Sequence, residues 1–414
     1  MRIASLADTH LGFAGPGRSE GGRAVREIDV ERAFSAALDR VVERQPDLVT
    51  FGGDNFHSVV PSTAAKIAWR DGLQRILDET SAHVVVVGGN HCTPRTSGVV
   101  SPNMLAPRHE RMHVERAPGG VYLVPGAAVH GFGCSYLNRP GVVVPEPVPD
   151  ALNVLLIHAA VRSSARPDAV SKYYAGPDAY DVARAQGFDV VACGDFHEFR
   201  LLAGAEPETP EVLAGWADTH GFTGGPLAFY SGSIERTSSD IWSEHAPKGF
   251  VFVDTDARTL EFVEVPGRPM FDWSGEDVRW GHEAGVAREN GLEAPDWSRS
   301  DPLGCADLNE CLRVIAADPR TGDALVRLRV DDFPRAERDG IDWLLVGELQ
   351  RRCVLFRLDI RHPEAERVEF TDRRERAPHT LEGDARLFFA EDEPPVQRAC
   401  FDALGLAIPQ EVGA

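Results

Sequence analysis

The sequence predicts a layered α/β sandwich, followed by a smaller α/β unit and a C-terminal segment. Up to about residue 265, short apolar runs rich in valine alternate with segments of helical periodicity, as expected for strands buried on both faces. Beyond residue 300, two further runs alternate apolar and charged side chains, which is typical of a small sheet with one solvent-exposed face. A chain of 414 residues is also long enough to form more than one domain.

The elements follow in order along the chain. Strands are expected at residues 2–7, 47–51, 83–88, 121–124, 128–132, 153–158, 189–193, 227–231 and 249–254, and helices at 30–42 and 64–77. The stretch 266–302 is irregular but holds three tryptophans, which usually pack, so we expect it to connect to the second unit. There, helices near 307–317 and 341–351 precede strands at 324–330 and 354–360. These patterns predict domains at 1–265 and 266–365, and a C-terminal segment at 366–414 with an amphipathic stretch at 396–404.

The charge balance is strongly acidic. The chain has 43 basic and 64 acidic residues, which gives a formal net charge of −21 at pH 7. A nucleic-acid-binding protein usually presents a basic face, because the release of counterions supplies much of its affinity. We therefore expect the isolated chain to hold a DNA duplex weakly, unless metals, a local arginine patch or a basic partner offset the charge.

No apolar run approaches the ~18 residues of a membrane span, so no membrane association is expected. The chain enters its first strand directly after Met1, so we expect no signal peptide and a cytoplasmic location. Seven cysteines are scattered without a CxxC pair, which argues against a disulfide framework or a zinc ribbon.

Five apolar runs in the first region each end in a cluster of polar residues. The clusters are Asp8-Thr9-His10, Gly53-Asp54-Asn55, Gly89-Asn90-His91, His158, and Gly194-Asp195-Phe196-His197. Ligand sites of open α/β sheets lie at the carboxyl ends of the strands, which is where these clusters fall. Mixed carboxylate, imidazole and amide ligands suit manganese or iron better than calcium. Two such ions roughly 4 Å apart activate water and neutralise a phosphate, and Asp54, preceded by two glycines, is the natural bridge between them.

This ordered series resembles that of the calcineurin-like metallophosphoesterases. Further segments resemble, within that family, the SbcD-type DNA nuclease subunit, which works with an SMC-like ATPase: Asp8-Thr9-His10-Leu11-Gly12, Gly53-Asp54-Asn55-Phe56-His57, Tyr230-Ser231-Gly232-Ser233-Ile234-Glu235-Arg236 and Lys248-Gly249-Phe250. The resemblance covers residues 1 to about 255, and the rest of the chain by order and size only. It implies an α-β-β-α sandwich with a smaller cap domain.

The resemblance also implies a set of ligands. One metal would bind Asp8, His10, Asp54 and His197, and the other Asp54, Asn90, His158 and Asp195. His91 would face the phosphate and act as proton donor or transition-state stabiliser, and the first of these roles suits imidazole. The expected cofactors are two manganese ions, with magnesium or iron as alternatives.

Two positions depart from the family pattern. Asp195 stands where the family usually has histidine, which puts the affinity of the second metal position in question. Cys92 stands where an acidic residue usually follows the equivalent of His91, and its absence could weaken catalysis. His57 and His130 lie off the motif pattern and are expected to be structural.

Some roles remain open from the sequence. Ser231, Ser233 and Arg236 could contact a phosphate, although small polar residues around a glycine also form turns. The segment 203–226, which the family usually keeps shorter, could be a lid at the metal site or an insertion without function.

Three functions compete. The leading one is a metal-dependent DNA exonuclease and endonuclease subunit that processes DNA ends in repair or recombination with a coiled-coil ATPase. The cap would guide the DNA, the C-terminal segment would dock the partner, and a homodimer is conceivable. The alternatives are a metallophosphoesterase acting on nucleotides or other small phosphoesters, which the acidity favours, and a catalytically weak scaffold subunit, which Asp195 and Cys92 favour.

Overall fold

The computed structural model describes residues 1–363 except 97, 116–118, 135–145, 163–179, 182–184, 204–218, 222–225, 276–277 and 279–302. The chain divides into two compact units, Met1–His362 and Pro363–Ala414. The predicted docking segment and its amphipathic stretch at 396–404 therefore lie outside the described residues, as do Trp280, Trp297 and most of the segment 203–226. The domain limits inferred from the sequence stay a prediction.

Two mixed sheets form the main body of the first unit. The seven-stranded sheet has the order β14-β17-β16-β1-β4-β5-β6, with β1 (Arg2–Leu6), β4 (Leu48–Gly52), β5 (His83–Val87), β6 (Met112–Val114), β14 (Thr219–Gly221), β16 (Gly249–Asp254) and β17 (Thr259–Glu264). Its members β1, β4, β5 and β6 run parallel, and β16 pairs antiparallel with β1.

The second sheet has six strands. Its order is β13-β15-β12-β9-β8-β7, with β7 (Gly120–Val124), β8 (Ala127–Phe132), β9 (Leu152–His158), β12 (Val190–Gly194), β13 (Arg200–Ala203) and β15 (Leu227–Tyr230). The four inner strands β8, β9, β12 and β15 are parallel, and the two outer strands are antiparallel to their neighbours.

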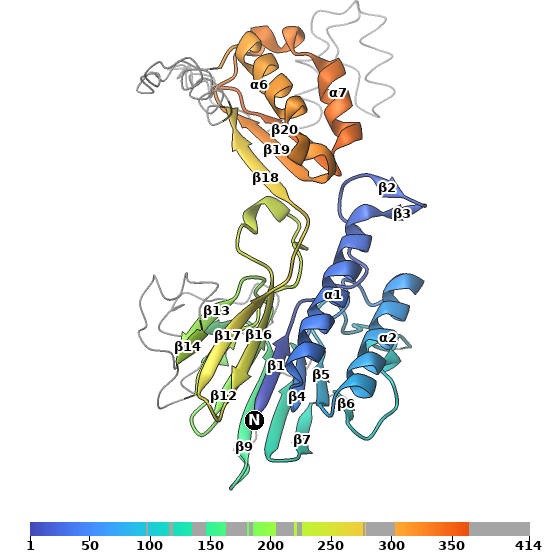
Figure 1. The fold of residues 1–414 in the computed structure, drawn as a ribbon, viewed down its shortest axis with the longest axis vertical. Coiled ribbons are helices and arrows are strands. Elements are labelled where there is room, and N and C mark those ends of the chain that lie inside the picture. The colour runs from blue at the N-terminus through green and yellow to red at the C-terminus, as the bar shows by residue number, and fades with distance from the viewer. Residues whose placement is uncertain are drawn as a thin grey trace, which may run out of the picture. The chain divides into compact units, whose positions relative to one another are not determined.

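The two sheets pack face to face through fully buried aliphatic side chains. Val85 and Val251 of the first sheet belong to the same apolar core as Val129, Leu156 and Ala192 of the second. The outer face of the first sheet is covered by α1 (Val25–Arg44) and α2 (Thr63–Glu79), which lie side by side (Figure 1). The outer face of the second sheet is apolar and buried as well. The predicted layered α/β sandwich is therefore confirmed.

Helix α1 begins at Val25, five residues before the predicted start. Its first turn is polar but buried: the Arg26 guanidinium, 1% exposed, donates to Asp29 Oδ2 at 2.8 Å. Buried ion pairs inside a helix hide the apolar periodicity by which a helix is found in a sequence, so the pattern missed this turn.

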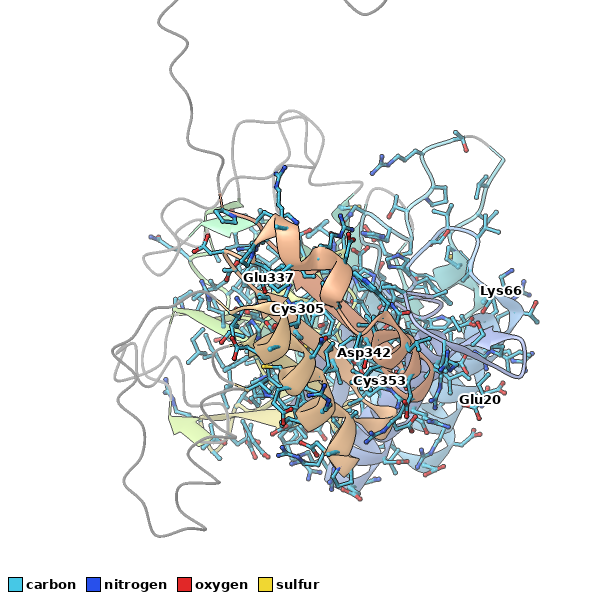
Figure 2. All side chains as sticks on the ribbon, turned by 90° about the horizontal axis from the view of Figure 1, so that it is seen from above. Glu20, Lys66, Cys305, Glu337, Asp342 and Cys353 are labelled. Atoms are coloured by element: carbon cyan, nitrogen blue, oxygen red, sulfur yellow. The ribbon has the colours of Figure 1, made fainter. Side chains whose placement is uncertain are left out.

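A smaller sheet follows, formed by the parallel strands β18 (Met270–Ser274), β19 (Leu325–Val330) and β20 (Leu355–Ile360). Helices α6 (Cys305–Ala317) and α7 (Trp343–Arg352) share its apolar core. The helix starts are fixed by carboxylates: Asp342 accepts from Leu345 N–H at 3.0 Å, and Glu337 accepts from Cys305 N–H at 2.5 Å (Figure 2). Both alternating strands lie where the sequence predicts them.

None of the helices in the described ranges is long and apolar enough to cross a membrane.

Trp69 of α2 is the aromatic centre of the layer that supports the first sheet. It is fully buried, stacks on Phe34 of α1 and makes edge contacts with Phe51 of β4 and with Phe56 in the loop that follows. We expect Trp69→Ala to lower the free energy of unfolding by about 3–5 kcal/mol, because the cavity opens among three aromatic rings. Ile67→Ala on the same helix, where the side chain is 47% exposed, should cost within about 0.5 kcal/mol. Chemical denaturation measures both, and equal losses would contradict this account of the packing.

Candidate metal centre

The five polar clusters meet at one edge of the sandwich. The clusters of Asp8, Asp54 and Asn90 follow β1, β4 and β5, which are adjacent and parallel, so their carboxyl ends share one edge. His158 is the last residue of β9, and Asp195 directly follows the neighbouring parallel strand β12. The two sheets approach closely there, since a Cβ on Gly194 would lie 2.2 Å from the carbonyl oxygen of Gly52.

The ligand atoms form three overlapping groups, in each of which the atoms lie within 4.8 Å of one another. The first holds Asp8, His10 and His197, the second Asp8, Asp54 and His158, and the third His10, His57 and His91. Asp54 Oδ2 lies between the first two groups, 3.9 Å from His10 Nε2 and 3.5 Å from His158 Nε2. A carboxylate in that place can bridge two cations.

Asn90 and Asp195 complete the second group around His158. Asn90 Oδ1 lies 3.1 Å and Asp195 Oδ1 lies 3.7 Å from His158 Nε2. The backbone N–H of Asp195 also donates to both carboxylate oxygens of Asp8, at 3.2 and 3.1 Å. All seven side chains predicted to be metal ligands are thus brought together, with their roles as ligands still predictions.

The hydrogen bonds of the three histidine rings fit a metal centre. Nδ1 of His158 donates to Gly52 O at 2.8 Å, and Nδ1 of His197 donates to Glu244 Oε1 at 3.0 Å. His10 Nδ1 lies 3.3 Å from His57 Nδ1. Because each Nδ1 is engaged outside the cluster, each Nε2 faces into it, and His10 Nε2 lies 3.0 Å from His197 Nε2. Metal-bound histidines typically bind the ion through one nitrogen and donate the other N–H to such an acceptor.

The backbone carrying these residues is strained. Asp8, His10 and Asp54 have φ values of 50°, 44° and 45°, and Asp195 has 101°, all in a region that side-chain-bearing residues seldom adopt. The loops hold one another in place, since Asp8 N–H donates to Gly53 O at 3.0 Å and His10 N–H to Asp54 O at 2.9 Å. Strain of this kind concentrates at functional sites.

Burial and charge shift the titration of the cluster. Burial raises the pKa of Asp8 to about 7, against the attraction of His158 and His197. Burial also opposes the ionisation of Asp54, but the adjacent His158 holds its pKa well below the usual range. Conversely, burial disfavours the charged form of His158, but the surrounding carboxylates raise its pKa to about 10. The centre of the cluster therefore favours positive charge.

His91 and His57 lie together at the rim. His91 is exposed, its backbone N–H donates to Asp54 Oδ1 at 2.8 Å, and its ring Nδ1 donates to the carbonyl oxygen of His57 at 3.0 Å. The His57 and His91 ring centroids are 5.0 Å apart, and burial lowers the pKa of His57 to about 4. His57, expected to be structural, thus belongs to the site. Its place in the same loop, three residues after Asp54, was the available signal.

His130 differs from His57. It is fully buried in β8, where its Nε2 lies 3.1 Å from Asn153 Oδ1, away from the clustered strand ends. Its predicted structural role agrees with this contact.

The remaining candidates make internal contacts. Ser231 and Ser233 are each 1% exposed. The Ser231 hydroxyl lies 2.9 Å from Ser5 Oγ, and the Ser233 hydroxyl donates to Glu235 O at 2.8 Å. The Arg236 guanidinium donates to Glu244 O at 3.1 Å. This geometry does not support direct contact between the two serines and a phosphate.

Cys92, which replaces an acidic residue of the family pattern, is fully buried behind the Gly89 loop. Its sulfur accepts a hydrogen bond from Gly89 N–H at 3.3 Å, and burial raises its pKa to about 12. The thiol is therefore neutral at physiological pH and supplies no charge to orient His91.

Residues 1–199 match the model of the calcineurin-like phosphoesterase family. Residues 1–199 therefore resemble a calcineurin-like metallophosphoesterase domain, and all seven of the clustered side chains predicted to be ligands lie within this matched part of the chain.

Three archaeal relatives are similar over a longer stretch, and each is named DNA double-strand break repair protein Mre11. The protein of Methanopyrus kandleri is 27% identical over 300 residues, which cover 67% of this chain and 58% of that protein. The protein of Archaeoglobus fulgidus is 24% identical, over 67% of this chain and 62% of that protein. The protein of Methanosarcina acetivorans is 26% identical, over 63% of this chain and 38% of that protein. The chain thus spans less than two thirds of the length of each relative. The narrower SbcD-type resemblance stays a prediction.

A substitution of Gly53 can test how tightly the two sheets hold His158 in place. The φ of Gly53 is +95°, and a Cβ there would lie 2.4 Å from His158 Nδ1. Gly98 has a nearly equal φ of +92° and no atom within 4 Å of its Cβ position. Gly98→Ala therefore loses free energy of unfolding only through the unfavourable backbone conformation. We expect Gly53→Ala to lose at least about 1 kcal/mol more free energy of unfolding than Gly98→Ala, because His158 must shift. Urea titration measures both, and equal losses would show that His158 is not held against Gly53.

Proposed function

We propose that this protein is a metal-dependent DNA nuclease that hydrolyses phosphodiesters with two divalent ions. The observation that carries the proposal is the position of the Asp54 carboxylate between His10 and His158, with the Nε2 atoms of His10, His158 and His197 facing into the cluster. The similarity to archaeal proteins named for DNA double-strand break repair supports DNA as the substrate.

Two sets of oxygen and nitrogen ligands are available for the two ions. Asp8, His10, Asp54 and His197 would hold one, and Asp54, Asn90, His158 and Asp195 the other. When bound, the ions supply a strong oxygen nucleophile and neutralise charge on the phosphate. Oxygen and imidazole donors in this mixture favour manganese, with magnesium or iron as alternatives.

His91 is placed to move the proton. Its Nδ1 is committed to the His57 carbonyl, which leaves Nε2 as the atom that can donate to a leaving oxygen. The bond from its backbone N–H to Asp54 ties the position of the ring to the predicted bridging carboxylate. His57 fixes the orientation of this ring and of His10, so we assign it a positioning role.

The SbcD-type resemblance and the charge are the basis for proposing a partner and an assembly. We propose that the protein processes DNA ends in the cytoplasm with an SMC-like coiled-coil ATPase, and that residues 366–414 dock this partner. The domain of residues 266–365 would guide DNA to the metals, and a homodimer would present two such sites. The net charge of −21 is the reason to assign much of the DNA affinity to the partner.

A second candidate function is hydrolysis of nucleotides or other small phosphoesters, which the same acidity favours. One assay separates the two from a catalytically weak scaffold: purified protein with manganese is offered hairpin DNA, linear duplex and a small phosphodiester. Cleavage of either DNA supports the nuclease. Turnover of the small ester alone supports the second function, and no turnover at all supports the scaffold.

The first prediction from this proposal concerns two site residues. Asp54→Ala should remove both metals, because losing a shared carboxylate leaves neither ion fully ligated. His91→Ala should keep both metals but lower the cleavage rate by at least about 100-fold, as expected for loss of a proton donor. Metal analysis and single-turnover cleavage check both variants. Two bound ions in Asp54→Ala, or parental cleavage by metal-loaded His91→Ala, would refute the assigned roles.

The second prediction concerns DNA affinity. At physiological salt the isolated chain should bind duplex weakly, and its complex with the ATPase should bind far more tightly, with affinity that falls steeply as salt rises. Fluorescence anisotropy over a salt titration measures this for both. Tight and salt-sensitive binding by the chain alone would contradict the prediction and reveal a basic groove within it.

A further inference from the structure

Glu244 makes a contact that no sequence motif indicated. It follows the short turn η3 (Ile241–Ser243) and is 4% exposed, yet its carboxylate reaches the ring of His197, 47 residues away in the chain. Glu244 Oε1 accepts from His197 Nδ1 at 3.0 Å, from Ser238 N–H at 2.7 Å and from Thr237 N–H at 3.3 Å. Three donors on one oxygen hold the carboxylate in a single orientation.

Lys248 completes this arrangement. Its ammonium group is buried and directs its three donors at Glu244 Oε2, at Ser233 Oγ (3.1 Å) and at the carbonyl oxygen of His197 (3.0 Å). A lysine has three N–H bonds to donate, so this buried cation is fully satisfied. It balances the charge of Glu244 and also fixes the backbone of His197.

We propose that Glu244, held by Lys248, is a positioning residue that sets the metal affinity of the site formed by Asp8, His10 and His197. The proposal rests on the proposed function only in that divalent ions bind at the cluster. A carboxylate that accepts from Nδ1 fixes the tautomer of the ring and makes its Nε2 a stronger donor to a metal.

The three histidines of the cluster differ in this respect. His158 donates to the carbonyl oxygen of Gly52 and His10 contacts the ring of His57, whereas His197 donates to a carboxylate that the Lys248 ammonium group also contacts. The two metal positions should therefore differ in how far they depend on Glu244.

The test compares manganese binding to Glu244→Gln and to a matched control in the full chain. Glu235→Gln makes the same carboxylate-to-amide change at a side chain that is 1% exposed and accepts from Arg26 and from the Arg236 N–H. Calorimetric titration with manganese, with circular dichroism to verify folding, is expected to show one of the two positions weakened about 10–100-fold in Glu244→Gln. The other position, and both positions of Glu235→Gln, should keep their parental affinity.

Two results would overturn the proposal: parental affinity at both positions of Glu244→Gln, or an equal loss in Glu235→Gln, which would mark a general effect of disturbing the buried loop. Glu244→Asp serves if the glutamine variant does not fold, and its shortened carboxylate should weaken the same position to a smaller degree. A parental chain that binds two manganese ions but cleaves no DNA would refute the proposed function alone, and the comparison of affinities would stand. A parental chain that binds no manganese would refute both.

Discussion

The structure depends on how closely the two sheets approach at the carboxyl ends of β4, β9 and β12. Glycines stand at the tightest points: a Cβ on Gly194 would meet the Gly52 carbonyl, and one on Gly53 would meet the ring of His158. The bond from His158 Nδ1 to Gly52 O then joins the second sheet to the first at 2.8 Å. Because no side chain stands between the sheets at these points, carboxylates and imidazoles from both sheets come within reach of a common cation.

The sequence predicts the strands and the clusters at their ends because both are local patterns. A run such as Val84 to Val87 identifies a buried strand, and the polar residues after it mark the edge where sites form. The contacts missed are those between distant segments. Nothing near Glu244 indicates that its carboxylate meets His197. The first turn of α1 is hidden because Arg26 is buried against Asp29 of the same helix and Glu235 of a distant segment.

Charge is distributed on two scales in this protein. The whole chain is acidic, but the described interior pairs its buried ions closely: Arg26 contacts Asp29 and Glu235, and Lys248 contacts Glu244. Buried pairs are tolerated only when nearly every donor and acceptor is satisfied. The cluster of Asp8, Asp54 and Asp195 differs, because its carboxylates face one another and histidine rings and so favour a cation between them.

Crossed backbone bonds join the first two loops, from Asp8 to Gly53 and from His10 to Asp54. They bear on which side chains at the site can be replaced as the sequence evolves. They join the loops that follow the paired strands β1 and β4, so main-chain bonds contribute to the shape of these ligand loops. Asp195 and Cys92, which depart from the pattern of the resembled family, lie in the loops after β12 and β5, outside these crossed bonds. The ligands at this edge can therefore vary while the backbone frame of the first two loops stays the same.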